Sequence, residues 1–255
     1  MRSLHSFTAK YSCSWAFICG LIPPVNISRF QSGDFEVLAV PVLYDNFVYL
    51  VCRDGKAVLI DAGEAKPVLK ILEKENLQLL NILITHTHHD HVGGCRAIID
   101  RLGVQSTSPG VEAGEFPALG TVCRSISTPG HMAVHKTYSF PEPGILFTGD
   151  TLINGACGRL LDGTAEQLFD SFQRIKTFPD ETRIFGGHDY LVDNMEFALS
   201  VEPENADVQA RLALYRKDSA AAIFATLAEE KKTNPFLRVE TVGEFAELRR
   251  RKDTF

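Results

Sequence analysis

The 255-residue sequence predicts a mixed α/β domain followed by a helical tail. Short β-branched or alternating runs dominate from residue 34 to about residue 187, and segments with helical spacing lie between them. After residue 188 the pattern becomes mostly helical. Strands first and helices last are typical of an α/β domain with a helical appendage.

The first 33 residues differ from the rest of the chain. No acidic residue precedes Asp34, and six serines lie in this stretch. A targeting peptide, a start site placed too far upstream and an irregular arm on the domain are three alternative interpretations. We expect an extension that is disordered or not native, with the folded domain beginning at residue 34.

Three strands are expected at the start of the domain. Residues 35–42, 47–53 and 57–63 are β-branched or alternating, and turn residues separate them. Residues 66–77 follow with apolar positions at helical spacing and therefore predict a helix.

A buried strand over residues 81–85 comes next, because this run is apolar and short. It ends at a cluster of histidines, and a helix is expected from about His91 to Leu102. Three further apolar or alternating runs predict strands at 121–128, 136–140 and 144–150.

The second half of the chain is richer in helix signals. Thr164 and Gln167 form a capping box, which predicts a helix to about Lys176. Residues 182–187 are the last clear strand. Two helices are then expected in the tail, over 205–217 and 242–253.

Half of the eight histidines lie in six consecutive positions, from His86 to His91. His86 and His88 are two apart, so both side chains point the same way only on extended chain. Asp90 and His91 lie on the turn into the next helix and face another direction. One loop can therefore offer ligands to two neighbouring metal ions, and imidazole and carboxylate suit zinc, iron or manganese. His89 alternates away, and we do not expect it to be a ligand.

Three later strand ends carry further metal-binding side chains. His131 follows a strand and a Pro-Gly turn, and Asp150 and His188 each end an apolar strand. Because open α/β sheets gather ligand sites beside strand ends, these residues are expected to complete the metal shells. His135 is interpreted as a structural residue.

These residues resemble the metallo-β-lactamase superfamily, and within it the glyoxalase II (hydroxyacylglutathione hydrolase) family. The resemblance covers about residues 36 to 255 and rests on the histidine cluster together with 41–51, 149–168, 187–198, 234–238 and 249–255. It implies an αββα sandwich over residues 34–188. It also implies a helical, glutathione-binding region over residues 189–255.

The resemblance implies two divalent metal ions per chain, with zinc as the first candidate and iron or manganese as alternatives. The first metal would be held by His86, His88 and His131, and the second by Asp90, His91 and His188. Asp150 would bridge both ions. Asp90 and Asp150, together with a bridging hydroxide, would carry the catalysis.

The implied reaction is hydrolysis of S-(2-hydroxyacyl)glutathione thioesters, such as S-D-lactoylglutathione to D-lactate and glutathione, the second step of methylglyoxal detoxification. The hydroxide would attack the thioester carbonyl. A thiol with a pKa of about 8.5 leaves without a dedicated acid. No separate Ser-His or Cys-His pair is therefore needed for catalysis, and Cys157 is not expected to act as a nucleophile. The resemblance places Arg159, Tyr190, Arg249 and Lys252 near glutathione, whose carboxylates suit cationic donors.

Some positions depart from the family pattern. Leu161 stands where relatives have an aromatic residue, Met132–Val134 change the loop after His131, and Asp189 replaces a glutamate. These departures bear on substrate preference. No metal ligand is lost.

The main alternative is an iron-dependent persulfide dioxygenase of the same fold, which would retain His86, His88, His131 and Asp150. His188 and the cationic C-terminus favour the thioesterase instead. A β-lactamase is another alternative on this fold, but one large class of these enzymes has cysteine where Asp150 stands. A metal-binding or scaffold protein without catalytic activity is disfavoured, because such chains usually lose ligands and all seven are present here.

The bulk composition limits the partners. The net charge of −6 argues against nucleic acid, and no apolar run reaches the ~20 residues needed to span a membrane. The six cysteines are scattered, which favours a reducing compartment. We expect a cytoplasmic monomer, with organelle targeting by residues 1–33 as the alternative.

Overall fold

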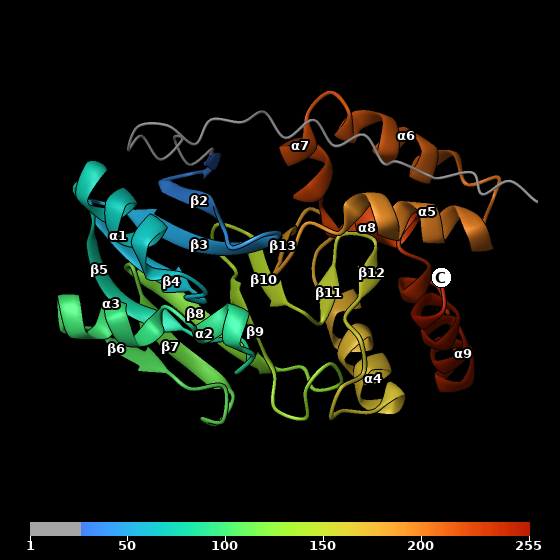
Figure 1. Ribbon diagram of the computed structural model, residues 1–255, viewed down its shortest axis with the longest axis horizontal. Coiled ribbons are helices and arrows are strands. Elements are labelled where there is room, and N and C mark those ends of the chain that lie inside the picture. The colour runs from blue at the N-terminus through green and yellow to red at the C-terminus, as the bar shows by residue number, and fades with distance from the viewer. Residues whose placement is uncertain (1–26) are drawn as a thin grey trace, which may run out of the picture.

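Two β-sheets form the centre of the molecule in the computed structural model, which describes residues 27–255 (Figure 1). The first sheet has the order β1 (Ser28–Ser32), β2 (Phe35–Val42), β3 (Asn46–Arg53), β4 (Lys56–Ile60), β5 (Gln78–Leu83) and β6 (Gln105–Thr107). The second has the order β13 (Arg183–Gly186), β10 (Ile145–Gly149), β9 (Lys136–Phe140), β8 (Thr121–Ser127) and β7 (Gly114–Ala118). A small hairpin, β11 (Leu152–Ile153) with β12 (Ala156–Cys157), follows β10.

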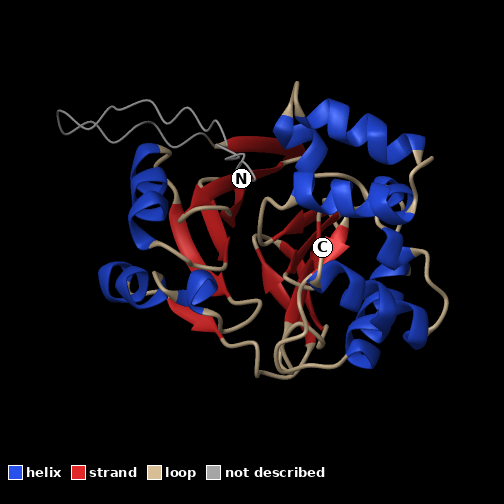
Figure 2. Cartoon of the chain, turned by 45° about the vertical axis from the view of Figure 1, so that its right-hand side comes forward, coloured by secondary structure: helices blue, strands red, loops and turns tan. Residues whose placement is uncertain are grey.

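Helices cover the outer faces of both sheets (Figure 2). On the first sheet, α1 (Ala65–Lys74) and α3 (Cys95–Leu102) pack against the apolar cluster of β2 to β5. On the second sheet, α4 (Ala165–Lys176) packs together with parts of the C-terminal tail. The four layers confirm the predicted αββα sandwich.

Alternation along the strands divides the side chains between two cores. In β3, Tyr49 and Val51 face the second sheet, whereas Val48 and Leu50 face the helices. Between the sheets, Tyr49 packs edge-on against Phe185, with ring centroids 5.3 Å apart. The buried runs of the sequence therefore hold the two sheets face to face.

The expected extension over residues 1–33 needs a correction at its C-terminal end. Ser28–Ser32 form β1, which pairs antiparallel with β2. Phe30 packs against the ring of Phe224 at 4.8 Å, and Arg29 bonds to Glu36. β1 has only five residues, and none of its side chains is fully buried, so the sequence of this strand carries little apolar signal. Residues 1–26 lie outside the described part of the chain.

The helix expected from His91 to Leu102 is two helices. α2 (His89–Val92) ends at Gly93, and α3 begins after Gly94. A Cβ at Gly94 would lie 2.4 Å from the backbone nitrogen of Ala65. The chain between α2 and α3 can therefore lie against the start of α1 only because this residue has no side chain. The break leaves the histidine-bearing turn free to face the second sheet.

The tail is helical, as predicted, and has more elements than the sequence indicated. Its helices are α5 (Leu191–Val201), α6 (Ala206–Tyr215), α7 (Ser219–Ile223), α8 (Leu227–Thr233), a 3-10 turn (Pro235–Leu237) and α9 (Val242–Asp253). Phe236 and Phe245 of the tail are buried against Phe172 of α4. No helix in the part of the chain from residue 27 onward is long and apolar enough to cross a membrane.

Candidate metal centre

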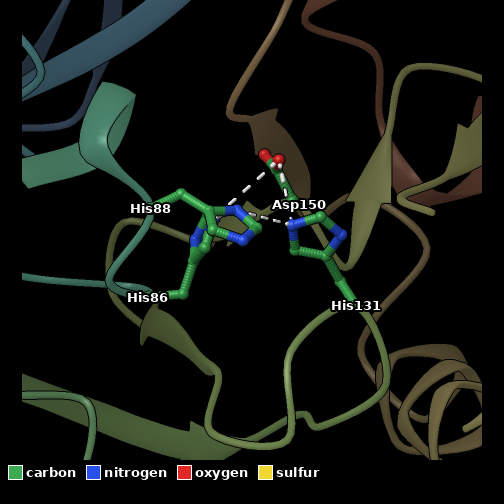
Figure 3. Close-up of side chains that lie close together, drawn as sticks. All are labelled: His86, His88, His131 and Asp150. Atoms are coloured by element: carbon green, nitrogen blue, oxygen red, sulfur yellow. Dashed lines mark hydrogen bonds and ion pairs between the residues drawn. The ribbon is translucent and has the colours of Figure 1, made fainter. Parts of the chain in front are cut away.

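Seven predicted ligands converge where strands of both sheets end. Ligand atoms of His86, His88, His131 and Asp150 all lie within 4.8 Å of one another, and we call these four residues the first cluster. In Figure 3 the two histidines of the first loop face His131, with the carboxylate of Asp150 beside them. The Nε2 atom of His86 lies 2.9 Å from Nδ1 of His88, which in turn lies 3.1 Å from Nε2 of His131.

The second cluster consists of Asp90, His91 and His188, whose ligand atoms also lie within 4.8 Å of one another. Asp150 stands between the two clusters. Its Oδ2 lies 3.5 Å from Nε2 of His131 and 3.3 Å from Nε2 of His188, and its Oδ1 lies 3.5 Å from Nε2 of His91. The position of Asp150 is therefore the one that a bridging ligand would need. His89 is exposed and belongs to neither cluster.

Glycines beside the ligands make this crowding possible. A Cβ at Gly187 would lie 2.4 Å from Oδ1 of Asp150 and 2.7 Å from the ring of His91. A Cβ at Gly158 would lie 2.2 Å from the carbonyl oxygen of Asp150. Glycine is required at both positions, because a Cβ at either one would overlap with Asp150 and with the ring of a predicted histidine ligand.

Hydrogen bonds behind the ligands fix which nitrogen of each ring faces the centre. Nδ1 of His91 lies 2.8 Å from Asp61, Nδ1 of His188 lies 3.0 Å from Asp45, and Nδ1 of His131 lies 2.8 Å from the carbonyl oxygen of Arg159. Each partner is an acceptor, so Nδ1 carries the proton and Nε2 presents its lone pair.

His86 is held in the same way. The hydroxyl of Thr85 donates to Asp61 at 2.8 Å and so accepts from Nδ1 of His86 at 3.0 Å. On its other face, the ring of His86 stacks on His135 with centroids 4.9 Å apart. The structural interpretation of His135 fits this position, since its Nε2 also accepts from the backbone N–H of Asp150.

The donor set fits divalent cations. Oδ1 of Asp150 is buried and has no hydrogen-bond partner among the described residues. A buried carboxylate oxygen without a donor is costly unless a cation balances it. Nδ1 of His88 lies 2.9 Å from Nε2 of His86 and 3.1 Å from Nε2 of His131, and three ring nitrogens this close together suit a shared cation. The chain thus carries a His/Asp cluster able to bind divalent metal.

The protonation states of His86 and Asp150 suit metal binding, whereas His91 must first lose a proton. Burial lowers the pKa of His86, which keeps its imidazole neutral. Burial raises the pKa of Asp150, but His91 and His188 outweigh this effect and hold it well below its usual range. Burial lowers the pKa of His91, and Asp150 and Asp61 more than offset this, raising it to about 9. A cation bound by His91 therefore displaces a proton.

The Asp61→Asn substitution tests the support behind His91. The oxygen of the new amide can still accept from the backbone N–H of Thr85. Its NH₂ group then faces Nδ1 of His91 and cannot accept the proton that this nitrogen carries. We expect metal affinity to fall about 10- to 100-fold, as is typical when a residue behind a metal ligand is lost. Titration of metal-free protein with zinc against a chromophoric chelator measures the change. Wild-type affinity in the variant would show that Asp61 does not orient His91.

A pocket of about 450 Å³ opens directly beside the first cluster. Its lining includes all four predicted substrate contacts and two of the predicted metal ligands, namely Arg159, Tyr190, Arg249, Lys252, His131 and Asp150. A larger depression of about 830 Å³ beside α1 and α3 has no histidine in its lining. The smaller pocket is therefore the candidate substrate site.

The cations of this pocket differ in their surroundings. Arg249 is only 3% exposed, and its Nη1 donates to the carbonyl oxygen of Cys157 at 2.8 Å. Its guanidinium therefore also supports the β11–β12 hairpin. Lys252 is partly buried, with Nζ 4.9 Å from the centroid of Phe197. Burial raises the pKa of Cys157 to about 11, so this thiol stays protonated, in line with the expectation that it is not a nucleophile.

Several supporting residues were not predicted from the sequence. They are buried or half-buried polar residues that contact the ligands: Asp45, Asn46, Asp61, Thr85 and Asn154. Asn46 donates to Oδ2 of Asp90 at 2.7 Å. Asp61 directly follows β4, and Asp45 lies three positions after β2. Polar residues near these strand ends were the available signal, because strand ends meet at the same edge.

Family models match most of the chain. The model described as metallo-beta-lactamase superfamily matches residues 43–127 and 124–188, and the model described as hydroxyacylglutathione hydrolase C-terminus matches residues 189–255. The two matches meet between residues 188 and 189.

Similar proteins carry the same description. The chain is 38% identical over 226 residues to a hydroxyacylglutathione hydrolase of Chromohalobacter salexigens, covering 81% of this chain and 88% of that one. It is 38% identical over 253 residues to the Synechococcus enzyme of that name, covering 85% and 98%.

Solved structures share the fold. The crystal structure of ETHE1 from Myxococcus xanthus has a TM-score of 0.64 at 24% identity and covers 88% of this chain and 90% of that one. The di-iron-bound form of TTHA1623 has a TM-score of 0.58 at 25% identity and covers 78% and 98%.

Proposed function

Because the chain belongs to the hydroxyacylglutathione hydrolase family of the metallo-β-lactamase superfamily, we propose that it hydrolyses S-(2-hydroxyacyl)glutathione thioesters, with S-D-lactoylglutathione as the reference substrate. The observation that carries this proposal is the cationic pocket lying against the His/Asp clusters. A thioester with an anionic thiol portion fits both halves of such a site.

We assign two divalent cations to the site. The first cluster would hold one and the second cluster the other, and Asp150, which lies between them, would serve both. When bound, such cations lower the pKa of water and polarise the substrate carbonyl, which supplies the nucleophile and stabilises the developing charge. The chain's own part is to hold imidazole lone pairs and two carboxylates toward that centre. Asp90 is fixed for this task by Asn46, and His188 by Asp45.

The substrate's peptide portion is assigned to the pocket beside the first cluster. Arg159 and Lys252 offer positive charge to the carboxylates of glutathione, and Arg249 adds to the field from its buried position. The ring of Tyr190 stacks on His188 at 4.7 Å and lines the same pocket, so it can contact both the substrate and a metal ligand. This arrangement would bring the thioester carbonyl toward Asp150.

The experiment is a hydrolysis assay with purified protein and S-D-lactoylglutathione, with and without chelator, alongside its metal content. We expect chelator-sensitive turnover and about two metals per chain, which is the stoichiometry of a two-metal hydrolytic site. Zinc, iron and manganese are each added back to the chelated protein to identify the metal that supports turnover. Absence of turnover at full metal occupancy would contradict the proposal.

Adjacent histidines provide a matched pair for this assay. His88→Ala removes a member of the first cluster and is expected to reduce turnover and metal content together. His89→Ala changes the same residue type one position later, where the side chain is exposed. We expect wild-type turnover from the latter variant, and equal losses in both would argue against the assigned ligand set.

The persulfide dioxygenase alternative is tested in parallel. Oxygen uptake with glutathione persulfide should be absent, because the tail matches the hydroxyacylglutathione hydrolase C-terminus. The likeness to ETHE1 concerns the fold alone. The monomeric state and cytoplasmic location stay predictions, which light scattering and imaging of the tagged protein check.

Substrate affinity should depend on pH through Lys252. Burial and the neighbouring Arg249 lower the pKa of Lys252 to about 8. The ammonium therefore loses its proton as pH rises through 8, and its attraction for a carboxylate is lost. We expect KM to rise about 5- to 10-fold between pH 7 and 9, with a smaller change in kcat.

The Lys252→Arg variant is the control for this profile. Arginine stays charged throughout the range, while titration of the substrate itself is unchanged. Its KM should vary less with pH than that of the wild type. Identical profiles for the two proteins would assign the pH dependence to another group.

A further inference from the structure

Asn154 occupies the turn of the β11–β12 hairpin and is only 3% exposed. Both the nitrogen and the oxygen of its side-chain amide form hydrogen bonds with the backbone of one short segment, from His188 to Tyr190. Nδ2 donates to the carbonyl oxygen of His188 at 2.8 Å, and Oδ1 accepts from the backbone N–H of Tyr190 at 3.3 Å. The side chain of Asn154 thus contacts the backbone on both sides of Asp189. One of these neighbours, His188, is a predicted metal ligand, and the other, Tyr190, is a predicted substrate contact.

A second asparagine returns these contacts. Nδ2 of Asn194 donates to the carbonyl oxygen of Ile153 at 2.9 Å and to that of Asn154 at 3.3 Å, and Asn194 is only 2% exposed. We call Asn154 and Asn194 the asparagine clasp. Its four hydrogen bonds join the hairpin to the segment from His188 to Asn194.

The two sides of the clasp are the two sides of the site. The chain around the hairpin carries Asp150 before it and Arg159 after it. The opposite segment carries His188 of the second cluster and Tyr190 of the pocket wall. A change in the clasp would therefore move a metal ligand and a substrate contact together.

The hairpin does not need Asn154 for its own attachment. The N–H of Gly155 donates to Glu230 at 3.0 Å, and Asn234 donates to the carbonyl oxygen of Ala156 at 3.1 Å. These bonds already hold the turn to the tail. The side chain of Asn154 is directed instead to the backbone of His188 and Tyr190, at a backbone φ of +20° that asparagine tolerates better than most residues.

We propose that Asn154 is a positioning residue that couples the second metal cluster to the substrate pocket, by fixing His188 and Tyr190 in one register against the hairpin. The proposal rests on the two-metal site and substrate pocket of the proposed function. It predicts that losing this one amide weakens metal binding at the second cluster and substrate binding together.

The test compares Asn154→Gly and Asn154→Ala with Asn205→Ala. Glycine removes the amide and accepts the backbone φ without strain. Asn205 is a matched control, because its side chain caps α6 and bonds to Glu202 and Lys232, so the same chemical change removes a similar number of hydrogen bonds in the tail. Thermal unfolding confirms that each variant folds.

Zinc titration of metal-free protein against a chelator gives the first measurement. In the Asn154 variants, the second equivalent of zinc should bind about 10-fold more weakly, as for loss of a residue behind a metal ligand, while the first equivalent changes less than about 2-fold. KM for S-D-lactoylglutathione at saturating zinc should rise roughly 2- to 10-fold, the range for one lost hydrogen bond. Asn205→Ala should change neither quantity.

Two results would overturn the proposal. One is an Asn154→Gly variant that binds both zinc equivalents and the substrate as the wild type does. The other is an Asn205→Ala variant that reproduces both losses, because general destabilisation would then be their cause. If the alanine variant does not fold, the glycine variant decides. A wild-type protein that binds no second zinc ion would instead contradict the proposed function, and it would contradict this inference as well.

Discussion

Replacing Asp150 with alanine is expected to lower thioester hydrolysis by more than about 100-fold, since even residues behind metal ligands contribute about 10- to 100-fold. Asp150 lies within 3.5 Å of histidines from both clusters. The other carboxylate among the predicted ligands, Asp90, contacts His91 and His188, which both belong to the second cluster. Its removal also deprives neighbouring imidazoles of a negative charge. Metal content should therefore fall together with kcat/KM.

An exposed aspartate that belongs to neither cluster controls for this variant. Asp170 lies exposed on α4, so Asp170→Ala removes the same group without touching a ligand. It should retain wild-type turnover and metal content. If Asp150→Ala kept both metals and its activity, the bridging assignment would be wrong.

Replacing Glu230 with leucine is expected to destabilise the fold by about 3–5 kcal/mol, the range for breaking a buried ion pair. Glu230 is 1% exposed and accepts from Nη2 of Arg211 at 2.7 Å. It also accepts from the N–H of Gly155 and from Asn234. The variant leaves a buried guanidinium and a backbone donor without their acceptor.

Urea unfolding measures this change, and the double variant Arg211→Met/Glu230→Leu provides its comparison. Replacing both charges leaves no unpaired ion, so the double variant should be more stable than the single Glu230 variant. Equal stability of the two would show that the loss comes from Gly155 and Asn234 and not from the ion pair. Because Glu230 also holds the hairpin turn that carries Asn154, its loss should lower activity as well as stability.

Much of the fold could be predicted because its elements carry local patterns. The predicted strand over 35–42 coincides with β2, and the predicted helix over 242–253 coincides with α9. The capping box of Thr164 and Gln167 begins α4 as expected. In contrast, β1 and the break between α2 and α3 depend on packing against distant segments, and neither has a sufficient local signal.

The candidate ligands were also accessible from the sequence. His86, His88, Asp90 and His91 lie within one loop, and the three others each follow a strand. Metal ligands at strand ends have a recognisable context, because strands of one sheet end at a common edge. The structure brings all seven together, while their roles as ligands stay predictions until metal is measured.

The residues behind the ligands were decided only by the tertiary structure. Asp45 is 143 positions from His188, Asp61 is 30 positions from His91, and Asn154 is 34 positions from His188. A hydrogen bond depends on position within a few tenths of an ångström, and no periodicity in the sequence encodes contacts between such distant segments.

The sequence by itself determined the types of the main elements and the seven candidate ligands, because local spacing and residue chemistry carry each of them. The cationic residues of the pocket were named only through the resemblance to a known family. Only the tertiary structure decided which nitrogen of each hydrogen-bonded imidazole faces the centre, and which buried amide lies between the metal centre and the pocket. These properties depend on distances between segments that meet only when the two sheets pack face to face.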